Sequence, residues 1–62
     1  MYIVIDKMTG KIWSPVTHQW ENYNGLAIPH GYNTPVEAMH AKKKLTEAIG
    51  DEDRFSVRFT MF

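Results

Sequence analysis

The chain has no cysteine, no excess of either charge and no long apolar segment, and each absence argues against a class of protein. Without cysteine, its 62 residues cannot use the disulfides or cysteine-bound zinc that stabilise many short domains. The 7 basic and 7 acidic residues cancel, which argues against a protein that binds nucleic acid mainly through phosphate contacts. No apolar run approaches the roughly 18 residues of a membrane span, and no segment has the features of a signal peptide. We therefore expect one domain, residues 1–62, with no membrane contact.

Aromatic residues are abundant instead, at 13% of the chain. A domain of about 60 residues buries only about 60% of the surface of its unfolded chain, so its stability is marginal. Each aromatic side chain can bury about 150–250 Å², which compensates for short length and also suits a dimer interface. The aromatic residues are Tyr2, Trp13, Trp20, Tyr23, Tyr32, Phe55, Phe59 and Phe62.

Residues 2–14 have the pattern of a β-hairpin. A β-branched run precedes a turn whose first residue, Asp6, can accept hydrogen bonds from N–H groups inside the turn. Gly10 can adopt the left-handed conformation that closes a type I turn with a bulge. Pairing Asp6 with Lys11 then places Ile5 opposite Ile12. One face of the hairpin carries Ile3, Ile5 and Ile12, and the other carries Tyr2, Val4 and Trp13.

Residues 15–33 are the least regular stretch, because Pro15, the Asn24–Gly25 pair, Pro29 and Gly31 interrupt it. A structureless loop of this length is uncommon in a compact domain. We expect an ordered segment that packs its aromatic side chains, with a short strand at 19–23 or 26–28.

Residues 34–50 predict a helix with both ends marked. Thr34 is the expected N-cap, Pro35 the first helical residue, and Glu37 completes a capping box. Gly50 follows the expected last residue, Ile49. The apolar face of this helix comprises Ala38, Ala41, Leu45, Ala48 and Ile49.

Residues 54–62 alternate in the manner of a half-buried strand. Phe55, Val57, Phe59 and Met61 point one way, with Arg54, Ser56, Arg58, Thr60 and Phe62 on the other side. We expect a small α+β domain of ββαβ order, with a three-stranded antiparallel sheet (order 2-1-3). Its helix packs on the face that carries Ile3, Ile5, Ile12 and Phe55.

The other face of this sheet is the candidate binding surface. Aromatic and arginine side chains are too frequent there for a solvated sheet face, and they are the types enriched at interface hot spots. Three accounts compete: the segment 15–33 covers this face, the face associates with a second copy, or it binds another partner. The candidate residues, with Trp20 and Tyr23 of that segment, are Tyr2, Val4, Trp13, Trp20, Tyr23, Arg54, Arg58 and Phe62.

No residue pattern predicts catalysis, a metal or a cofactor. His18 and His30 can meet with Glu21 as a third ligand, but the spacing matches no known metal site. Ser14, Thr17 and His18 are close in sequence without a turn that presents a hydroxyl for nucleophilic attack. We expect a protein that is not an enzyme.

The run Lys42–Lys44 fans widely around the predicted helix and is typical of a solvated surface. The lysines also lie on the opposite side of the sheet from Arg54 and Arg58, so the two cationic groups cannot easily cooperate. An open aromatic face can stack on the bases of single strands. Single-stranded nucleic-acid binding is therefore the alternative function, although nucleic acid is the less favoured partner.

Several segments together resemble a group of small bacteriophage-encoded accessory proteins, most of them uncharacterised. The resemblance covers Thr9-Gly10-Lys11-Ile12-Trp13-Ser14-Pro15, then Trp20, then Tyr32-Asn33-Thr34-Pro35-Val36-Glu37-Ala38. It implies an accessory protein in the cytoplasm of a bacterial host that binds and modulates one host protein. It brings no catalytic residues. We therefore expect a non-enzymatic protein-binding module that acts alone or as a homodimer.

Overall fold

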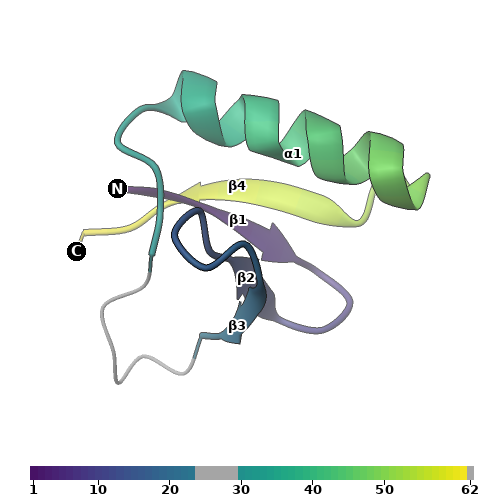
Figure 1. The fold of residues 1–62 in the computed structure, drawn as a ribbon, viewed down its shortest axis with the longest axis horizontal. Helices are drawn as coiled ribbons and strands as arrows, with labels where there is room; N and C mark the ends of the chain where they lie inside the picture. The colour runs from purple at the N-terminus through teal and green to yellow at the C-terminus, as the bar shows by residue number, and fades with distance from the viewer. Residues whose placement is uncertain (24–29, 62) are drawn as a thin grey trace.

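The computed structural model describes residues 1–23 and 30–61. Within them the chain forms β1 (Tyr2–Asp6), β2 (Lys11–Trp13), β3 (Trp20–Asn22), α1 (Pro35–Ile49) and β4 (Phe55–Phe59). Figure 1 shows α1 running along the sheet beside β4 and β1, with the two ends of the chain close together. The backbone of Thr60 pairs with that of Met1, which holds these ends. The interruption expected at Asn24–Gly25, the alternative strand at 26–28 and the facing of Phe62 lie outside the described residues.

The strands form one antiparallel sheet in the order β3-β2-β1-β4 within the described part of the chain. The predicted α+β class is confirmed, as is the antiparallel placement of the last strand beside the first. The prediction of three strands in the order 2-1-3 is corrected to four, because β3 pairs with β2 and extends the sheet. This strand lies in the region 19–23, one of the two places where a short strand was expected.

The β1–β2 hairpin has the predicted pairing of Ile5 with Ile12. The Asp6 carboxylate accepts a hydrogen bond from the Met8 N–H at 2.9 Å, inside the turn. Gly10 is left-handed, with φ 76°, and its N–H donates to the Asp6 carbonyl at 2.8 Å. The turn therefore closes through the residue types that the sequence places there.

Helix α1 begins and ends where the sequence predicts. The Thr34 hydroxyl accepts a hydrogen bond from the Glu37 N–H at 3.3 Å, and left-handed Gly50 donates its N–H to the Thr46 carbonyl. Ala38 is completely buried, and Ala41 and Leu45 pack beside the core. Two residues of the predicted apolar face, Ala48 and Ile49, are exposed, so the buried face of α1 is narrower than expected.

The helix covers the face of the hairpin opposite to the predicted one. Val4 pairs with Val57, and Val4, Phe55 and Ala38 form the buried cluster of the core. Tyr2 and Trp13 pack against this cluster. Ile3 and Ile12 lie on the other face, where they are 2% and 1% exposed. The pairing within the hairpin is the predicted one, so the difference lies in the register of β4 against β1. Phe55 pairs with Asp6, which places Phe55 and Val57 on the Val4 side, and a shift by one residue would place them on the side of Ile3 and Ile5. Because β1 is apolar at consecutive positions, its own sequence does not select a face.

Two residues of the predicted strand 54–62 are also exposed, although the alternation of its sequence assigned them to the core: Phe59, at the end of β4, and Met61, beyond it. Phe59 is 59% exposed and Met61 93% exposed. The Phe59 ring meets the Tyr2 ring edge-on, with centroids 5.3 Å apart.

An aromatic row covers the part of this face that α1 leaves free. Trp13 meets Trp20 edge to face, with ring centroids 5.3 Å apart. Trp20 in turn stacks on Phe55 at 5.5 Å, although β3 and β4 are the opposite edges of the sheet. Trp20 therefore fills this face, as one of the three accounts expected, and α1 covers the rest of it.

A buried ion pair joins the hairpin turn to the start of β4. The Arg54 guanidinium donates to both Asp6 carboxylate oxygens, at 3.0 and 2.8 Å, and the Lys7 N–H donates to the Arg54 carbonyl at 2.8 Å. Asp6 is only 3% exposed. The guanidinium of Arg54 holds the pKa of the Asp6 carboxyl below its usual value, against the opposing effect of burial.

Within the described ranges, no helix has the length and apolar character required to cross a membrane.

We predict that Asp6→Asn lowers the free energy of unfolding by about 2 kcal/mol at pH 7, because it removes a charge from a buried bidentate pair. The pKa of Asp6 is lowered in the folded state, so its stabilising contribution is complete above the unfolded value of 3.8 and disappears as the pH falls through the folded value. Urea unfolding from pH 7 to pH 2 measures both effects. The wild type and the variant should converge at the acid end, whereas the exposed control Asp53→Asn should follow the wild type throughout.

Candidate functional site

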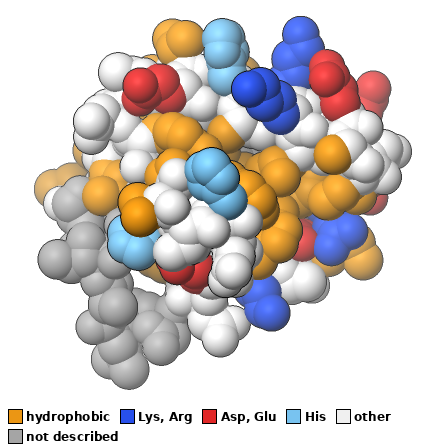
Figure 2. All heavy atoms as spheres, in the orientation of Figure 1, with side chains coloured by type: hydrophobic (Ala, Val, Ile, Leu, Met, Phe, Trp, Pro, Cys, Tyr) orange, Lys and Arg blue, Asp and Glu red, His pale blue; other side chains and the backbone are white. Residues whose placement is uncertain are grey.

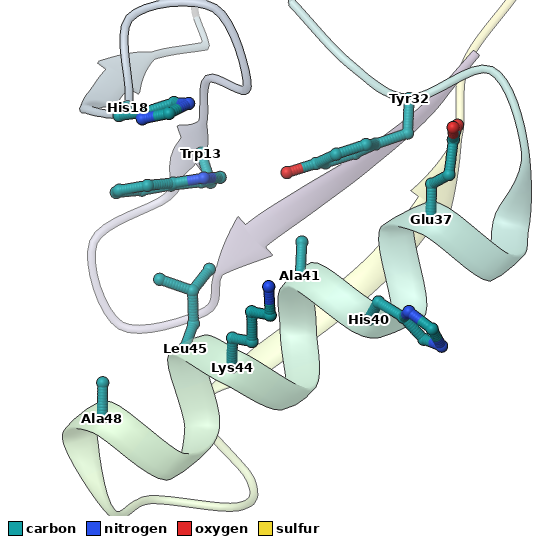
Figure 3. A pocket seen from close by; sticks show the side chains of 9 residues that line it. All are labelled: Trp13, His18, Tyr32, Glu37, His40, Ala41, Lys44, Leu45 and Ala48. Atoms are coloured by element: carbon teal, nitrogen blue, oxygen red, sulfur yellow. The ribbon is translucent and has the colours of Figure 1, made fainter.

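An open groove of about 540 Å³ lies between α1 and the strand end at Trp13. We call it the α1 groove. Figure 2 shows hydrophobic side chains exposed below α1, around the loop that follows β2. Figure 3 shows the walls of the groove, with Trp13 and Tyr32 facing the helix and His18 on the side of Trp13 away from the helix. The helix contributes Glu37, His40, Ala41, Lys44, Leu45 and Ala48.

Trp13 is held on two sides. Its ring meets Trp20 edge-on, and the His18 ring stacks over it, with centroids 6.4 Å apart and planes 17° from parallel. His18 has a positive φ of 55°, a conformation that histidine adopts more readily than most residues. Figure 3 shows the two rings lying parallel at one end of the groove. Trp13 is thus a fixed wall of the groove.

Ser14 fixes the loop that places His18. Its hydroxyl accepts hydrogen bonds from the N–H groups of Val16 at 3.2 Å and Thr17 at 3.1 Å. The Ser14 carbonyl accepts from the His18 N–H, and the Ser14 N–H donates to the Gln19 carbonyl, both at 3.0 Å. Ser14 is completely buried, so water cannot replace these partners, and the loop has to keep the conformation in which the hydrogen bonds form.

Tyr32 forms the second aromatic wall. Its backbone exchanges two hydrogen bonds with that of Tyr2, at 2.8 and 2.7 Å. Tyr2 lies at the start of β1, beyond the part of this strand that pairs with β2. Gly31 permits this approach, because a Cβ there would lie 2.7 Å from the Tyr2 carbonyl oxygen. In Figure 3 the Tyr32 hydroxyl points toward Trp13. Burial and the Glu37 carboxylate raise the pKa of Tyr32, so its hydroxyl stays protonated and can donate a hydrogen bond.

The helical wall combines small apolar side chains with a few charges. Ala41, Leu45 and Ala48 recur at the spacing of one helix face, and two of the three are alanines that leave space in front of Trp13. Figure 3 shows the Lys44 side chain reaching across the opening, Glu37 beside Tyr32, and His40 pointing away from the groove. The groove is therefore apolar along its walls, with a cation at its mouth and a carboxylate near Tyr32.

A cluster of polar side chains lies beside β3, at one edge of the sheet. His30 Nδ1 is 3.1 Å from the Ser14 hydroxyl and 3.1 Å from Glu21 Oε1. The Thr17 hydroxyl donates to the other Glu21 carboxylate oxygen at 3.3 Å. His30 and Glu21 thus meet, which the sequence allows without predicting it, whereas His18 stacks on Trp13 and does not join them.

This cluster has the residue types of a hydrolytic triad in a different arrangement. In such a triad the hydroxyl and the carboxylate bind opposite nitrogens of the imidazole, so that the ring can transfer a proton. Here both contact Nδ1, and the hydroxyl oxygen accepts backbone N–H groups. The arrangement fits a network that fixes the loop. Among the described residues, no group of three His, Asp or Glu side chains is placed to hold a metal ion.

The structure separates the eight candidate residues of the sequence. Val4 is completely buried, and Tyr2, Trp13 and Trp20 pack against the cluster that it forms with Ala38 and Phe55. The helix covers the β1 and β4 part of the face that carries these residues, and Trp13 stays accessible from the groove.

Of the other four candidate residues, the three that the structure describes do not lie together with these on one surface. Arg54 is bound to Asp6, and Arg58 is exposed on the opposite face, paired with Ile3 across the strands. Tyr23 is 39% exposed, just after β3, and Phe62 lies outside the described residues. The structure therefore brings Tyr2, Val4, Trp13 and Trp20 together in and beside the core, and places the two arginines apart from them.

The sequence predicts Ala41, Leu45 and Ala48 on the apolar face of the helix, as residues that pack on the sheet and not as the wall of a groove. Lys44 was expected in the solvated lysine run, with no link to a site. A signal was available: two alanines, Ala41 and Ala48, share a helix face with one larger residue, Leu45. Small side chains of this kind leave space beside an aromatic strand.

Comparison with known proteins adds no relative: the chain matches no protein-family model, no curated protein and no solved structure.

We predict that Ser14→Ala releases the His18 ring from Trp13 and lowers the free energy of unfolding by about 1–2 kcal/mol, because two N–H groups lose their shared acceptor. The NMR shifts of the His18 ring protons report the stacking. They should move toward the values of an unstacked histidine in the variant. Thr9→Ala removes one exposed hydrogen bond, from the Lys11 N–H, and should leave those shifts unchanged. Unchanged His18 shifts in Ser14→Ala would show that Ser14 does not hold the loop.

Proposed function

We propose that this protein is a non-enzymatic protein-binding module and that the α1 groove is its contact surface. The observation that carries the proposal is the open apolar groove between two fixed aromatic walls and a capped helix. Its volume lies in the range of binding sites, about 300–1,000 Å³. Tryptophan and tyrosine are enriched where interfaces concentrate their binding energy.

Rigid walls favour binding because they need no ordering when the partner arrives. Trp13 is held by His18 and Trp20, and the Tyr32 backbone is held by Tyr2. The groove is therefore formed before binding, which is the property expected of a dedicated contact site.

The partner that we propose is a protein of a bacterial host, in the host cytoplasm. This part rests on the resemblance to bacteriophage accessory proteins carried by the hairpin and the helix start. A small domain with one groove suits a modulator that occupies a site on a larger protein.

We do not pursue the alternative of single-stranded nucleic-acid binding, because the surface that it required is not open. Val4 is completely buried against α1, the guanidinium of Arg54 is bound to Asp6, and Arg58 lies on the opposite face of the sheet. A homodimer remains a second form of partner. Sedimentation of the pure protein distinguishes one chain from two, and a dimer that Ala48→Arg dissociates would place the second copy in the groove.

We predict that Ala48→Arg abolishes partner binding without unfolding the domain. Ala48 is exposed and lines one end of the groove, and a long side chain there extends back along the helix over Leu45 and Lys44. The control is Val36→Arg, which introduces the same side chain and the same charge at a helix position that is 63% exposed and does not line the groove.

Affinity capture from a bacterial lysate, with circular dichroism of each variant as a check of folding, measures the result. We expect one protein to be retained by the wild type and by Val36→Arg and lost by Ala48→Arg. Equal retention by all three would contradict the placement of the site in the groove. Absence of any retained protein with the wild type would contradict the proposal of a binding module.

A further inference from the structure

The chemistry of the α1 groove restricts what a partner can insert. Trp13 and Tyr32 present ring surfaces on one side, and Ala41 leaves space opposite them on the helix (Figure 3). One face of Trp13 is already occupied by His18. A flat side chain that enters between Trp13, Tyr32 and Ala41 meets rings on one side and methyl groups on the other. Aromatic pairs gain about 0.5–1.5 kcal/mol beyond the burial of their area, which favours an aromatic side chain over an aliphatic one.

The charges of the groove are separated along its length. Lys44 reaches across the mouth, and Glu37 lies beside Tyr32 toward the start of α1 (Figure 3). Within residues 1–23 and 30–61, Arg54 pairs with Asp6 and the His30 ring contacts Glu21, and no carboxylate of that part of the chain forms an ion pair with Lys44. A partner that carries a carboxylate at this position gains an ion pair there.

We propose that the α1 groove binds a protein segment in which an aromatic residue is next to an acidic one, with the ring between Trp13 and Ala41 and the carboxylate at Lys44. The proposal rests on the proposed function and specifies the chemistry of the partner. An extended segment fits better than an enclosed small molecule, because the groove is open along the helix. Adjacent residues of such a segment project in different directions, so one can enter the groove while the next reaches its rim.

Two capped synthetic peptides test the charge preference. One has the sequence Gly-Gly-Phe-Glu-Gly-Gly, and the other has Lys in place of Glu. Titration into ¹⁵N-labelled protein is followed at the indole N–H of Trp13, which lines the groove. The backbone N–H of Gly10, in the hairpin turn, is the internal reference. We expect the acidic peptide to bind about 1.5- to 5-fold more tightly than the basic one, the range of an exposed ion pair.

Reversing the charge of Lys44 tests whether this residue causes the preference for the acidic peptide. Lys44→Glu should exchange the order of the two peptides, so that the basic one binds more tightly. Lys43→Glu is the matched control, since Lys43 is exposed on the same helix and does not line the groove. It should leave the order unchanged.

A third peptide, Gly-Gly-Leu-Glu-Gly-Gly, tests the preference for a ring. Binding equal to that of the phenylalanine peptide would overturn the aromatic part of the proposal. Equal affinity for the acidic and basic peptides would overturn the charged part. A Trp13 indole that responds to none of the peptides would overturn the inference as a whole. The proposed function is judged separately, by the loss of a captured protein in Ala48→Arg, so the two failures are distinguishable.

Discussion

The Asp6 carboxylate is the constraint on which the rest of the structure depends. It accepts a hydrogen bond from the turn of the first hairpin and two from Arg54, at the residue before β4. Asp6, at the end of β1, therefore fixes the positions of both strands that flank β1, which are β2 and β4. Asp6 is paired with Phe55 across the strands, which places Val4 opposite Val57. This register brings Val4 and Phe55 onto one face, and that face receives the helix.

The groove follows from this choice of face. Helix α1 contacts β1 and β4 and leaves the β2 side of the same face to the aromatic side chains of Trp13 and Trp20. A bulky helix would close against these rings, but Ala41 leaves space in front of them. The loop anchored by Ser14 then places His18 on the outer face of Trp13. A short chain without disulfides thus fills its core with aromatic rings and still leaves one apolar surface open.

Local features could be predicted from the sequence, because each depends on a few adjacent residues. The left-handed Gly10 and the caps at Thr34 and Gly50 are examples. The face of the hairpin could not be predicted, because residues 2–5 are all apolar and carry no alternation. The opposite charges of Asp6 and Arg54 offered a clue to the register, but the sequence analysis assigned Arg54 to a binding surface. The groove forms only when the helix and Trp13 lie on the same face of the sheet. The sequence analysis placed them on opposite faces, so the groove could not be predicted.

The central claim is that α1 packs on the face that carries Val4 and Trp13, which creates the groove. Nuclear Overhauser effects from the Ala38 methyl group test this claim most directly, because Ala38 is the completely buried centre of the helix face. The account predicts contacts from this methyl group to Val4 and Phe55. Contacts from it to Ile3 and Ile5 instead would place the helix on the other face, and would contradict both the core and the groove described above.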